Sequence, residues 1–209
     1  MKGLVSLQES QPGREIVIIR HGQTLMNAND VIRGWAEVPL DEVGVEQAHD
    51  LGEEMLAENV ELDGIYTSDL QRSIETSLIV SKVTGIPLLG ITKDLRPWDV
   101  GDLTGTDGKK AHKIMTEYAT KKPDERLPGG ESFNTFKHRF LGGLIARLNS
   151  NRGLKLGFTS HSRGERIAHA WVSAGCPDSL EVDLGEFLAE GEEPATAQTL
   201  FIDSPLVFT

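Results

Sequence analysis

Two histidines in this chain end short apolar runs, and an arginine lies beside each of them. Residues 16–19 are four aliphatics in a row, and Arg20 and His21 follow directly. The arrangement recurs at His161, which ends a second such run and is followed two positions later by Arg163. A cation and an imidazole at the end of a buried strand are costly unless an anion binds there. The sequence therefore indicates an anion site.

Histidines and arginines that converge on one point suit a phosphoryl group. Arg72 follows a third strand-like run, 64–67, and adds another guanidinium. A guanidinium is a planar fork that binds phosphate oxygens in pairs and stabilises the charge of a transferring phosphoryl group. A neutral imidazole is a nucleophile near pH 7, and a second imidazole can hydrogen-bond an oxygen of the transferred group. These residue types therefore favour phosphoryl transfer.

A metal site is the main alternative use of two histidines, and the sequence disfavours it. There is no HxH or HExxH motif, and we identify no histidine–carboxylate cluster at ligand spacing. Adjacent arginines would repel a cation, and a single cysteine, Cys176, excludes a cysteine-based zinc site. We therefore expect no metal. The other histidines fall in helix-like patterns without an evident role: His49, His112, His138 and His169.

The candidate residues can meet only if strands bring them to one edge of a sheet. Strand-like runs alternate with helix-like periods, which predicts an α/β fold with a mostly parallel central sheet flanked by helices on both faces. Sites in such folds lie at the carboxyl ends of the strands. The predicted strands are 15–19, 64–67, 86–91, 154–159 and an edge strand at 199–202. The predicted helices are 42–58, 68–84, 110–119, 132–148 and one that ends near 174.

Local signals predict the starts and inward faces of three helices. Asp41 caps the first, whose apolar stripe is Val45, Ala48, Leu51, Met55 and Leu56. Ser68 and Asp69 start the second, whose stripe is Leu70, Ile74 and Leu78. Ser132 caps the third, whose stripe is Phe133, Phe136, Phe140, Leu144 and Leu148.

Composition bounds the class of protein. The 209 residues suit one α/β domain at 14–209, preceded by a polar tail at 1–13. A net charge of −11 argues against nucleic-acid or anionic-membrane partners. No apolar stretch is long enough to span a bilayer, and the N-terminus lacks the apolar region of a signal peptide. We therefore expect a cytoplasmic protein.

Four stretches of the chain resemble the histidine phosphatase superfamily, whose fold is that of phosphoglycerate mutase. The first, RHGQTLMNANDVIRGWAEVPLDEVGVEQA at 20–48, matches the family in the spacing of its RHG, threonine, asparagine, Gly-Trp and Pro-Leu positions. The others are YTSDLQRSIETS at 66–77, LPGGESFNTFKHRF at 127–140 and FTSHSRGERIAHA at 158–170. The resemblance implies that His21 is the nucleophile that becomes phosphohistidine, that Arg20 and Arg72 bind phosphate, and that His161 is the second histidine of the pocket.

The resemblance implies roles for three more residues. Thr24 and Asn27 lie where the family's loop contacts phosphate or substrate, and Glu131 of the GGES motif points toward the pocket. A carboxylate at the start of a helix is also favoured by the helix dipole, which offers a structural alternative for Glu131. The phosphatases of the family need no metal or organic cofactor, so no cofactor is expected.

The sequence departs from the family at the proton donor. The family's general acid is a glutamate in a stretch resembling L-x-E-x-x-x-G, and LRPWDVGDLTG at 95–105 has Pro97 in that position. Proline has no proton to donate to a leaving alkoxide. Side chains alternate in an extended segment, so Asp99 lies on the same side as Pro97 and is the favoured donor. Asp102, Glu131 or the absence of a dedicated donor remain alternatives.

A second departure follows His161, where the family often has two glycines and this chain has Ser162 and Arg163. Arg163 could contact the phosphate or a second anionic group of the substrate. The start of a helix disfavours a cation, which weakens the alternative of a solvated charge.

Three functions remain open at this stage. A phosphomonoester hydrolase that acts on a small phosphorylated substrate is favoured over a cofactor-dependent phosphoglycerate mutase, because mutases of this type are typically longer. A phosphate- or phosphoprotein-binding module with weakened catalysis is the third. Residues 101–131, rich in glycine and lysine, are expected to form a lid or insertion that selects the substrate. A homodimer through an edge strand is possible.

Overall fold

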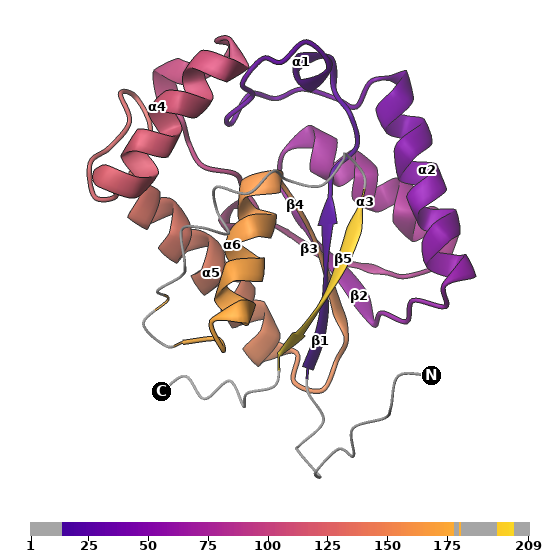
Figure 1. Cartoon of the computed structure of the whole chain (residues 1–209). Coiled ribbons are helices and arrows are strands. Elements are labelled where there is room, and N and C mark those ends of the chain that lie inside the picture. Colours follow the sequence, from indigo (N-terminus) through magenta and orange to yellow (C-terminus); the bar gives the residue numbers. More distant parts are fainter. Residues whose placement is uncertain (1–13, 178–179, 181–195, 203–209) are drawn as a thin grey trace, which may run out of the picture.

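The computed structural model describes residues 14–177, 180 and 196–202, which form a central sheet between helices (Figure 1). The five strands lie in the order β3 (Leu88–Thr92), β2 (Gly64–Ser68), β4 (Leu156–Ser160), β1 (Arg14–Arg20) and β5 (Ala197–Ile202). The first four run parallel, and β5 pairs antiparallel with β1 at the edge. The predicted α/β fold with a mostly parallel sheet is confirmed. The tail at 1–13 and almost all of the acidic stretch 177–195 lie outside the described residues.

Helices cover both faces of the sheet. They are α1 (Leu25–Ala28), α2 (Glu42–Ala57), α3 (Gln71–Thr84), α4 (Gly108–Lys121), α5 (Phe133–Ser150) and α6 (Ser162–Ser173), with short 3₁₀ turns η1 (Lys93–Leu95) and η2 (Gly101–Leu103). None of the helices among the described residues has the length and apolar character that a membrane crossing requires.

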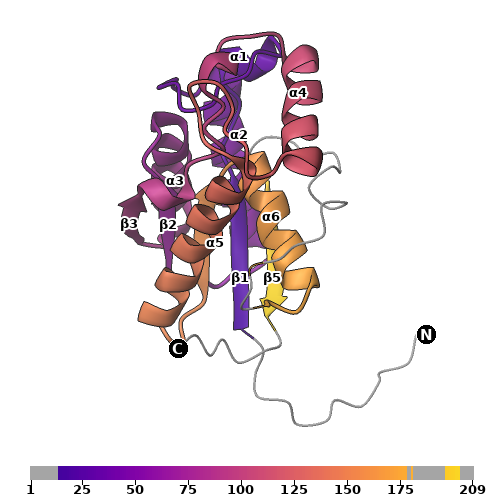
Figure 2. The ribbon, with the colours of Figure 1, turned by 90° about the vertical axis from the view of Figure 1, so that its left-hand side faces the viewer.

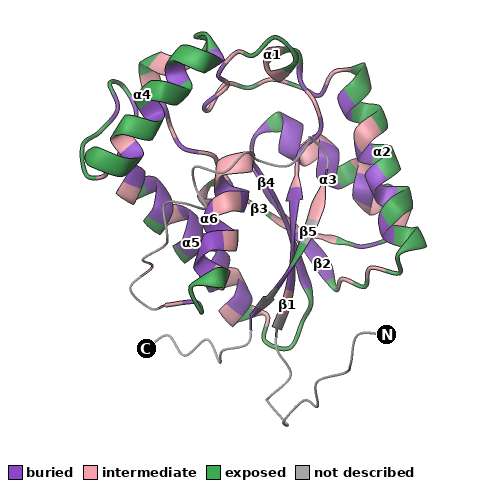
Figure 3. Cartoon of the chain, in the orientation of Figure 1, coloured by how far each residue is buried: buried purple, intermediate pink, exposed green. Residues whose placement is uncertain are grey.

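Strand β1 is buried on both faces, which explains its unbroken run of β-branched residues. Ile16 and Ile18 belong to the larger apolar cluster, with residues of α5 and α6. Val17 and Ile19 belong to the smaller cluster, with residues of α2 and α3. Figure 3 shows β1 and most of α5 buried, whereas α2 and α4 expose one side. The strand is therefore a rigid support for the residues that follow it.

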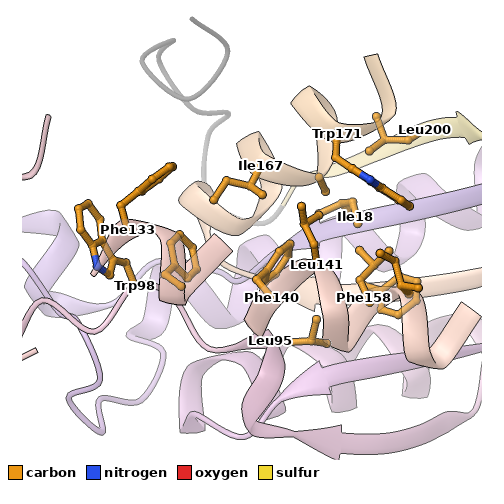
Figure 4. Packing of buried hydrophobic residues seen from close by; sticks show 14 of the residues in the cluster. Ile18, Leu95, Trp98, Phe133, Phe140, Leu141, Phe158, Ile167, Trp171 and Leu200 are labelled. Atoms are coloured by element: carbon orange, nitrogen blue, oxygen red, sulfur yellow. The ribbon is translucent and has the colours of Figure 1, made fainter. Parts of the chain in front are cut away.

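Helix α5 supplies three of the buried aromatic residues of the larger cluster, Phe133, Phe136 and Phe140 (Figure 4). Ser132 caps it, accepting a hydrogen bond from the Thr135 amide at 3.1 Å. All five residues of the predicted stripe are buried: Phe133, Phe136, Phe140, Leu144 and Leu148. Trp98 stacks on Phe136 with 6.3 Å between ring centroids, so the core also anchors the 95–105 segment.

Two other helices differ from the sequence expectation. On α2, Asp41 caps the helix as predicted, but Val45 and Leu56 are exposed. Helix α3 begins at Gln71 rather than at Ser68, and Leu78 is exposed. The side of α3 that is buried carries mainly small polar residues and one arginine: Arg72, Ser73, Thr76, Ser77 and Val80. The buried face predicted from the apolar periodicity is wrong for α3, because this helix turns polar side chains toward the site.

The 101–131 segment lies at the carboxyl end of β1. In two views at right angles, α4 stands beside α1 beyond that end of the sheet (Figures 1 and 2). The Gly108 amide donates to the Asp30 carbonyl at 2.7 Å, and Val31 pairs with Asp107 in an isolated bridge. The segment is thus joined to the loop that follows α1.

Candidate active site

His21 lies immediately after β1 and is 2% exposed. Its Nδ1 is 2.7 Å from the carbonyl oxygen of Gly22. A carbonyl only accepts, so Nδ1 carries the proton of the neutral ring and Nε2 keeps its lone pair. The amide of Gly22 donates to Thr76 Oγ1 on α3 at 3.1 Å, which fixes the backbone at this turn. The hydrogen bond to the Gly22 carbonyl therefore leaves Nε2 of the neutral ring unprotonated.

The surroundings of His21 keep its ring neutral. Burial lowers its pKa well below the ordinary value, and Arg72, Arg33 and Arg20 lower it further. The hydrogen bond to the Gly22 carbonyl acts in the opposite direction but is outweighed. A neutral imidazole at physiological pH is the form that can attack phosphorus.

His161 lies beside His21 because β4 and β1 are paired. The amide of His21 donates to the Ser160 carbonyl at 3.3 Å, and the two imidazole centroids are 5.0 Å apart. His161 is 4% exposed, and its Nε2 lies 3.1 Å from Ser68 Oγ at the end of β2. Burial lowers the pKa of His161 well below its ordinary value, and Arg72 and His21 add to this effect. The pairing of strands thus brings two neutral imidazoles together.

Arg72 is the most deeply buried cation of the site, at 1% exposed. Its Nη1 donates to the Ala36 carbonyl at 2.9 Å and its Nη2 to the Gly34 carbonyl at 3.0 Å. Gly34 has φ 47°, a conformation that favours glycine, and this turns its carbonyl toward the guanidinium. Within residues 14–177, 180 and 196–202, no carboxylate forms a salt bridge with Arg72. Burial and Arg33 lower its pKa to about 9.

Thr24 and Asn27 form the cap of α1. Asn27 Oδ1 accepts from both the amide and the hydroxyl of Thr24, each at 2.6 Å. Thr24 is fully buried, whereas Asn27 is partly exposed. The cap occupies the amide oxygen of Asn27, which leaves its Nδ2 group as the donor that can face a ligand. The predicted contacts of Thr24 and Asn27 with substrate remain predictions.

Glu131 and Arg139 hold the 95–105 segment. Glu131 Oε1 accepts from Arg139 Nη2 at 2.6 Å and from the amide of Asp99 at 3.0 Å. Arg139 Nη2 also donates to the Pro97 carbonyl at 3.0 Å, and Trp35 Nε1 donates to the same carbonyl at 2.9 Å. Donors from the chain itself therefore occupy the Glu131 carboxylate. This geometry favours a positioning role for Glu131 over the predicted contact with substrate.

The alternation predicted around Pro97 is present in the structure. Trp98 and Val100 are buried, while Pro97 and Asp99 are partly exposed, so the latter two share one side of the segment. Asp99 Oδ1 accepts from the Gly101 amide at 3.1 Å. Asp102 follows in η2 and is exposed. Asp99 therefore lies on the same side of the segment as Pro97, and its role as the proton donor remains a prediction.

A group of arginines extends the positive charge away from His21, and the sequence analysis missed one of its members. Arg33 lies in the loop after α1, and burial and Arg20 lower its pKa to about 10. Arg163 lies in the first turn of α6, and burial together with Arg166 and Arg33 lowers its pKa to about 9. The sequence feature that could have identified Arg33 as a site residue is its position directly before the Gly-Trp pair of the first motif.

Among the described residues, one group on α2 has potential metal-ligand atoms within 4.8 Å of one another: His49, Asp50 and Glu53. Helix α2 does not carry His21 or His161. The statement that no histidine stands with carboxylates at ligand spacing is therefore wrong for this group. All three side chains are exposed. They form an ordinary solvated helix surface, with His49 Nδ1 3.5 Å from Glu53 Oε1.

The chain belongs to the histidine phosphatase superfamily, branch 1, whose family model matches residues 16–180. It is 32% identical over 152 residues to a metal-independent phosphoserine phosphatase of Arabidopsis thaliana, covering 70% of this chain and 63% of that one, less than two thirds of its length. It is 28% identical over 201 residues to a 2,3-bisphosphoglycerate-dependent phosphoglycerate mutase of Mesorhizobium japonicum, covering 86% of this chain and 97% of the mutase. The solved mycobacterial glucosyl-3-phosphoglycerate phosphatase, in complex with VO3, superposes with a TM-score of 0.70 at 26% identity, covering 89% and 92% of the two chains.

Proposed function

We propose that this protein is a phosphomonoester hydrolase that acts through a phosphohistidine on His21. One observation carries the proposal: two buried polar atoms beside His21, Arg72 Nε and His161 Nδ1, have no hydrogen-bond partner among the described residues. Buried donors are costly to leave unsatisfied. His161 Nδ1 is a donor when its Nε2 accepts from the Ser68 hydroxyl. Oxygens of a phosphoryl group on His21 are acceptors for both atoms.

The reaction follows from the tautomer of His21. Its Nε2 lone pair attacks phosphorus while the bond from phosphorus to the leaving oxygen breaks, and Asp99 gives that oxygen a proton. Water then attacks the phosphohistidine and returns a proton to the Asp99 carboxylate. The nitrogen–phosphorus bond breaks, and inorganic phosphate leaves. Arg72 and Arg20 stabilise the negative charge on the transferring group throughout.

The phosphoenzyme is tested by rapid quench with a radiolabelled aryl phosphate. The wild type should give an acid-labile, base-stable adduct that His21→Ala lacks, while His138→Ala, a change at an exposed histidine, should retain it. Turnover without an adduct would reject the mechanism. The absence of both adduct and turnover over a broad panel of phosphomonoesters would support the binding-module alternative.

Leaving-group dependence tests Asp99 as the proton donor. Poor leaving groups need a proton and good ones do not, so Asp99→Asn should slow alkyl phosphates by about 10²- to 10⁴-fold and spare aryl phosphates. Asp102→Asn, at an exposed carboxylate in the same segment, is the matched control. Equal loss for both kinds of substrate in Asp99→Asn would reject this role.

A phosphoglycerate mutase remains the second candidate, because a named mutase aligns with 86% of this chain. The expectation that mutases are longer does not hold for that relative, of which the alignment covers 97%. Interconversion of phosphoglycerates that depends on added 2,3-bisphosphoglycerate would overturn the hydrolase proposal. The cytoplasmic location, the possible homodimer and the absence of nucleic-acid, membrane and cofactor partners remain predictions.

A further inference from the structure

Two helices hold the turn that follows β1. The amide of Gln23 donates to Gln47 Oε1 on α2 at 2.9 Å, and the amide of Gly22 donates to Thr76 Oγ1 on α3 at 3.1 Å. The turn is also closely packed, because a Cβ at Gly22 would meet the backbone carbonyl of Gly44 on α2. Both peptide groups that flank the Cα of Gly22 therefore have an N–H that a helix side chain anchors. Neither side chain takes part in the proposed reaction.

The anchor at Gln47 acts on the carbonyl that controls the ring of His21. The Gly22 carbonyl and the Gln23 amide belong to one planar trans peptide, so they point in opposite directions. The carbonyl is 2.7 Å from His21 Nδ1, and the amide is held by Gln47. Rotation of this peptide would break both bonds together, and the bond at the amide also polarises the carbonyl as an acceptor. Gln47 therefore stabilises the orientation in which the carbonyl accepts from Nδ1.

Thr76 anchors the preceding peptide and joins it to Arg72. Its hydroxyl accepts from the Gly22 amide and donates to the Arg72 carbonyl, one turn earlier in α3, at 2.8 Å. Thr76 is fully buried, so removal of its hydroxyl would leave the Gly22 amide unsatisfied in a buried place. A single hydroxyl group thus links the turn of His21 to the helix that carries Arg72.

We propose that Gln47 and Thr76 are positioning residues, which hold the Gly22 carbonyl against His21 Nδ1 and so keep the proton away from Nε2. The proposal rests on the hydrolase function, in which the Nε2 lone pair attacks phosphorus. The hydrogen bond made by one ring nitrogen decides which nitrogen carries the proton. When the carbonyl turns away, the proton can move to Nε2, which then has no lone pair for the attack.

Heteronuclear NMR of the unliganded protein, with ¹⁵N-labelled histidines, measures the tautomer directly. The signals of His21 are those missing from His21→Gln, and in the wild type they should show a protonated Nδ1 and an unprotonated Nε2. Gln47→Met removes the acceptor and should increase the fraction protonated at Nε2. Gln47→Glu keeps an oxygen at that place and should restore the wild-type signals. Thr76→Val and Thr76→Ser should behave as the same kind of pair.

Kinetics test the consequence for the reaction. Gln47→Met and Thr76→Val should slow phosphohistidine formation by about 10- to 100-fold, the effect of a slightly misplaced reacting group. KM should change less than about threefold, because the carbonyls of Gly34 and Ala36 still hold Arg72. Gln47→Glu and Thr76→Ser should recover most of the lost rate.

Thr84→Val is the matched control. Thr84 ends α3 and makes the same two kinds of bond as Thr76, to the Val80 carbonyl at 2.8 Å and from the Ile86 amide at 3.2 Å, at the end of the helix away from Arg72. Its variant should keep the wild-type tautomer and rate. Gln47 is partly exposed, so Gln47→Met provides the test if Thr76→Val does not fold.

An unchanged tautomer in Gln47→Met would overturn the proposal. So would a loss of rate that Gln47→Glu fails to restore, or the same loss in Thr84→Val. A wild type that forms no phosphohistidine, with the tautomer changes of the variants intact, would reject only the hydrolase function.

Discussion

The two buried histidines should make the stability of this protein depend on pH between 5.5 and 7.5. Both have pKa values well below the ordinary one in the folded chain, with burial as the first cause. In the unfolded chain each titrates near 6.5. As pH falls through that value the unfolded chain binds two protons that the folded chain does not, so stability is greatest above pH 6.5 and falls in acid.

The size of the effect follows from the linkage relation. A histidine that stays neutral in the folded state while its unfolded form titrates near 6.5 removes about 1.4 kcal/mol of stability between pH 7.5 and 5.5. His21 and His161 together should remove about 2.7 kcal/mol, a large part of the stability of an ordinary domain. Carboxylates and the other histidines contribute a background that is common to closely related variants.

Urea denaturation at pH 7.5, 6.5 and 5.5, in a buffer without phosphate, isolates the effect. His161→Gln keeps a polar group near Ser68, and it should lose about 1.4 kcal/mol less than the wild type over that range. His21→Gln should do the same. His138→Gln, at an exposed position on α5, controls for the loss of an imidazole. The same pH dependence in His161→Gln and the wild type would refute the reasoning that burial holds this ring neutral.

Two further predictions concern the scaffold. Arg139→Gln removes the partner of the largely buried Glu131 and should cost about 3–5 kcal/mol of unfolding free energy; an unchanged urea midpoint would show that the pair does not stabilise the fold. In Gly44→Ala the added Cβ would meet the backbone of Gln23, which should cost about 1–3 kcal/mol in the same assay. Gly142→Ala, where the new Cβ meets nothing within 4 Å on α5, should instead stabilise by about 0.5–1 kcal/mol, and a loss there would contradict the steric account.

Local patterns predicted the elements whose buried apolar residues lie close together along the chain. The apolar run 16–19 became the buried part of β1, and the stripe on α5 is buried throughout. These predictions succeeded because side-chain periodicity is a local property. On α3 the same reasoning misplaced Leu78, because the helix buries Arg72 and small polar residues instead. Only the pairing of strands shows that this side of α3 faces the site.

The sequence by itself determined the family of this protein and the residues on which the proposed reaction depends. His21, Arg20, Arg72 and His161 were recognisable because each follows or ends a strand, or lies in a motif of specific spacing. Only the tertiary structure decided how these and the remaining groups are used. It showed the hydrogen bond that leaves His21 Nε2 unprotonated, and it joined Glu131 to Arg139 instead of leaving it free in the site.

Arg33 shows the physical reason for the difference. In the sequence it is one arginine in a loop, 130 positions from Arg163. Only in the folded chain does Arg33 come close enough to Arg163 to lower its pKa, in addition to the effects of burial and of Arg166. A contact between distant segments depends on the packing of the whole domain, which no local pattern of residues encodes.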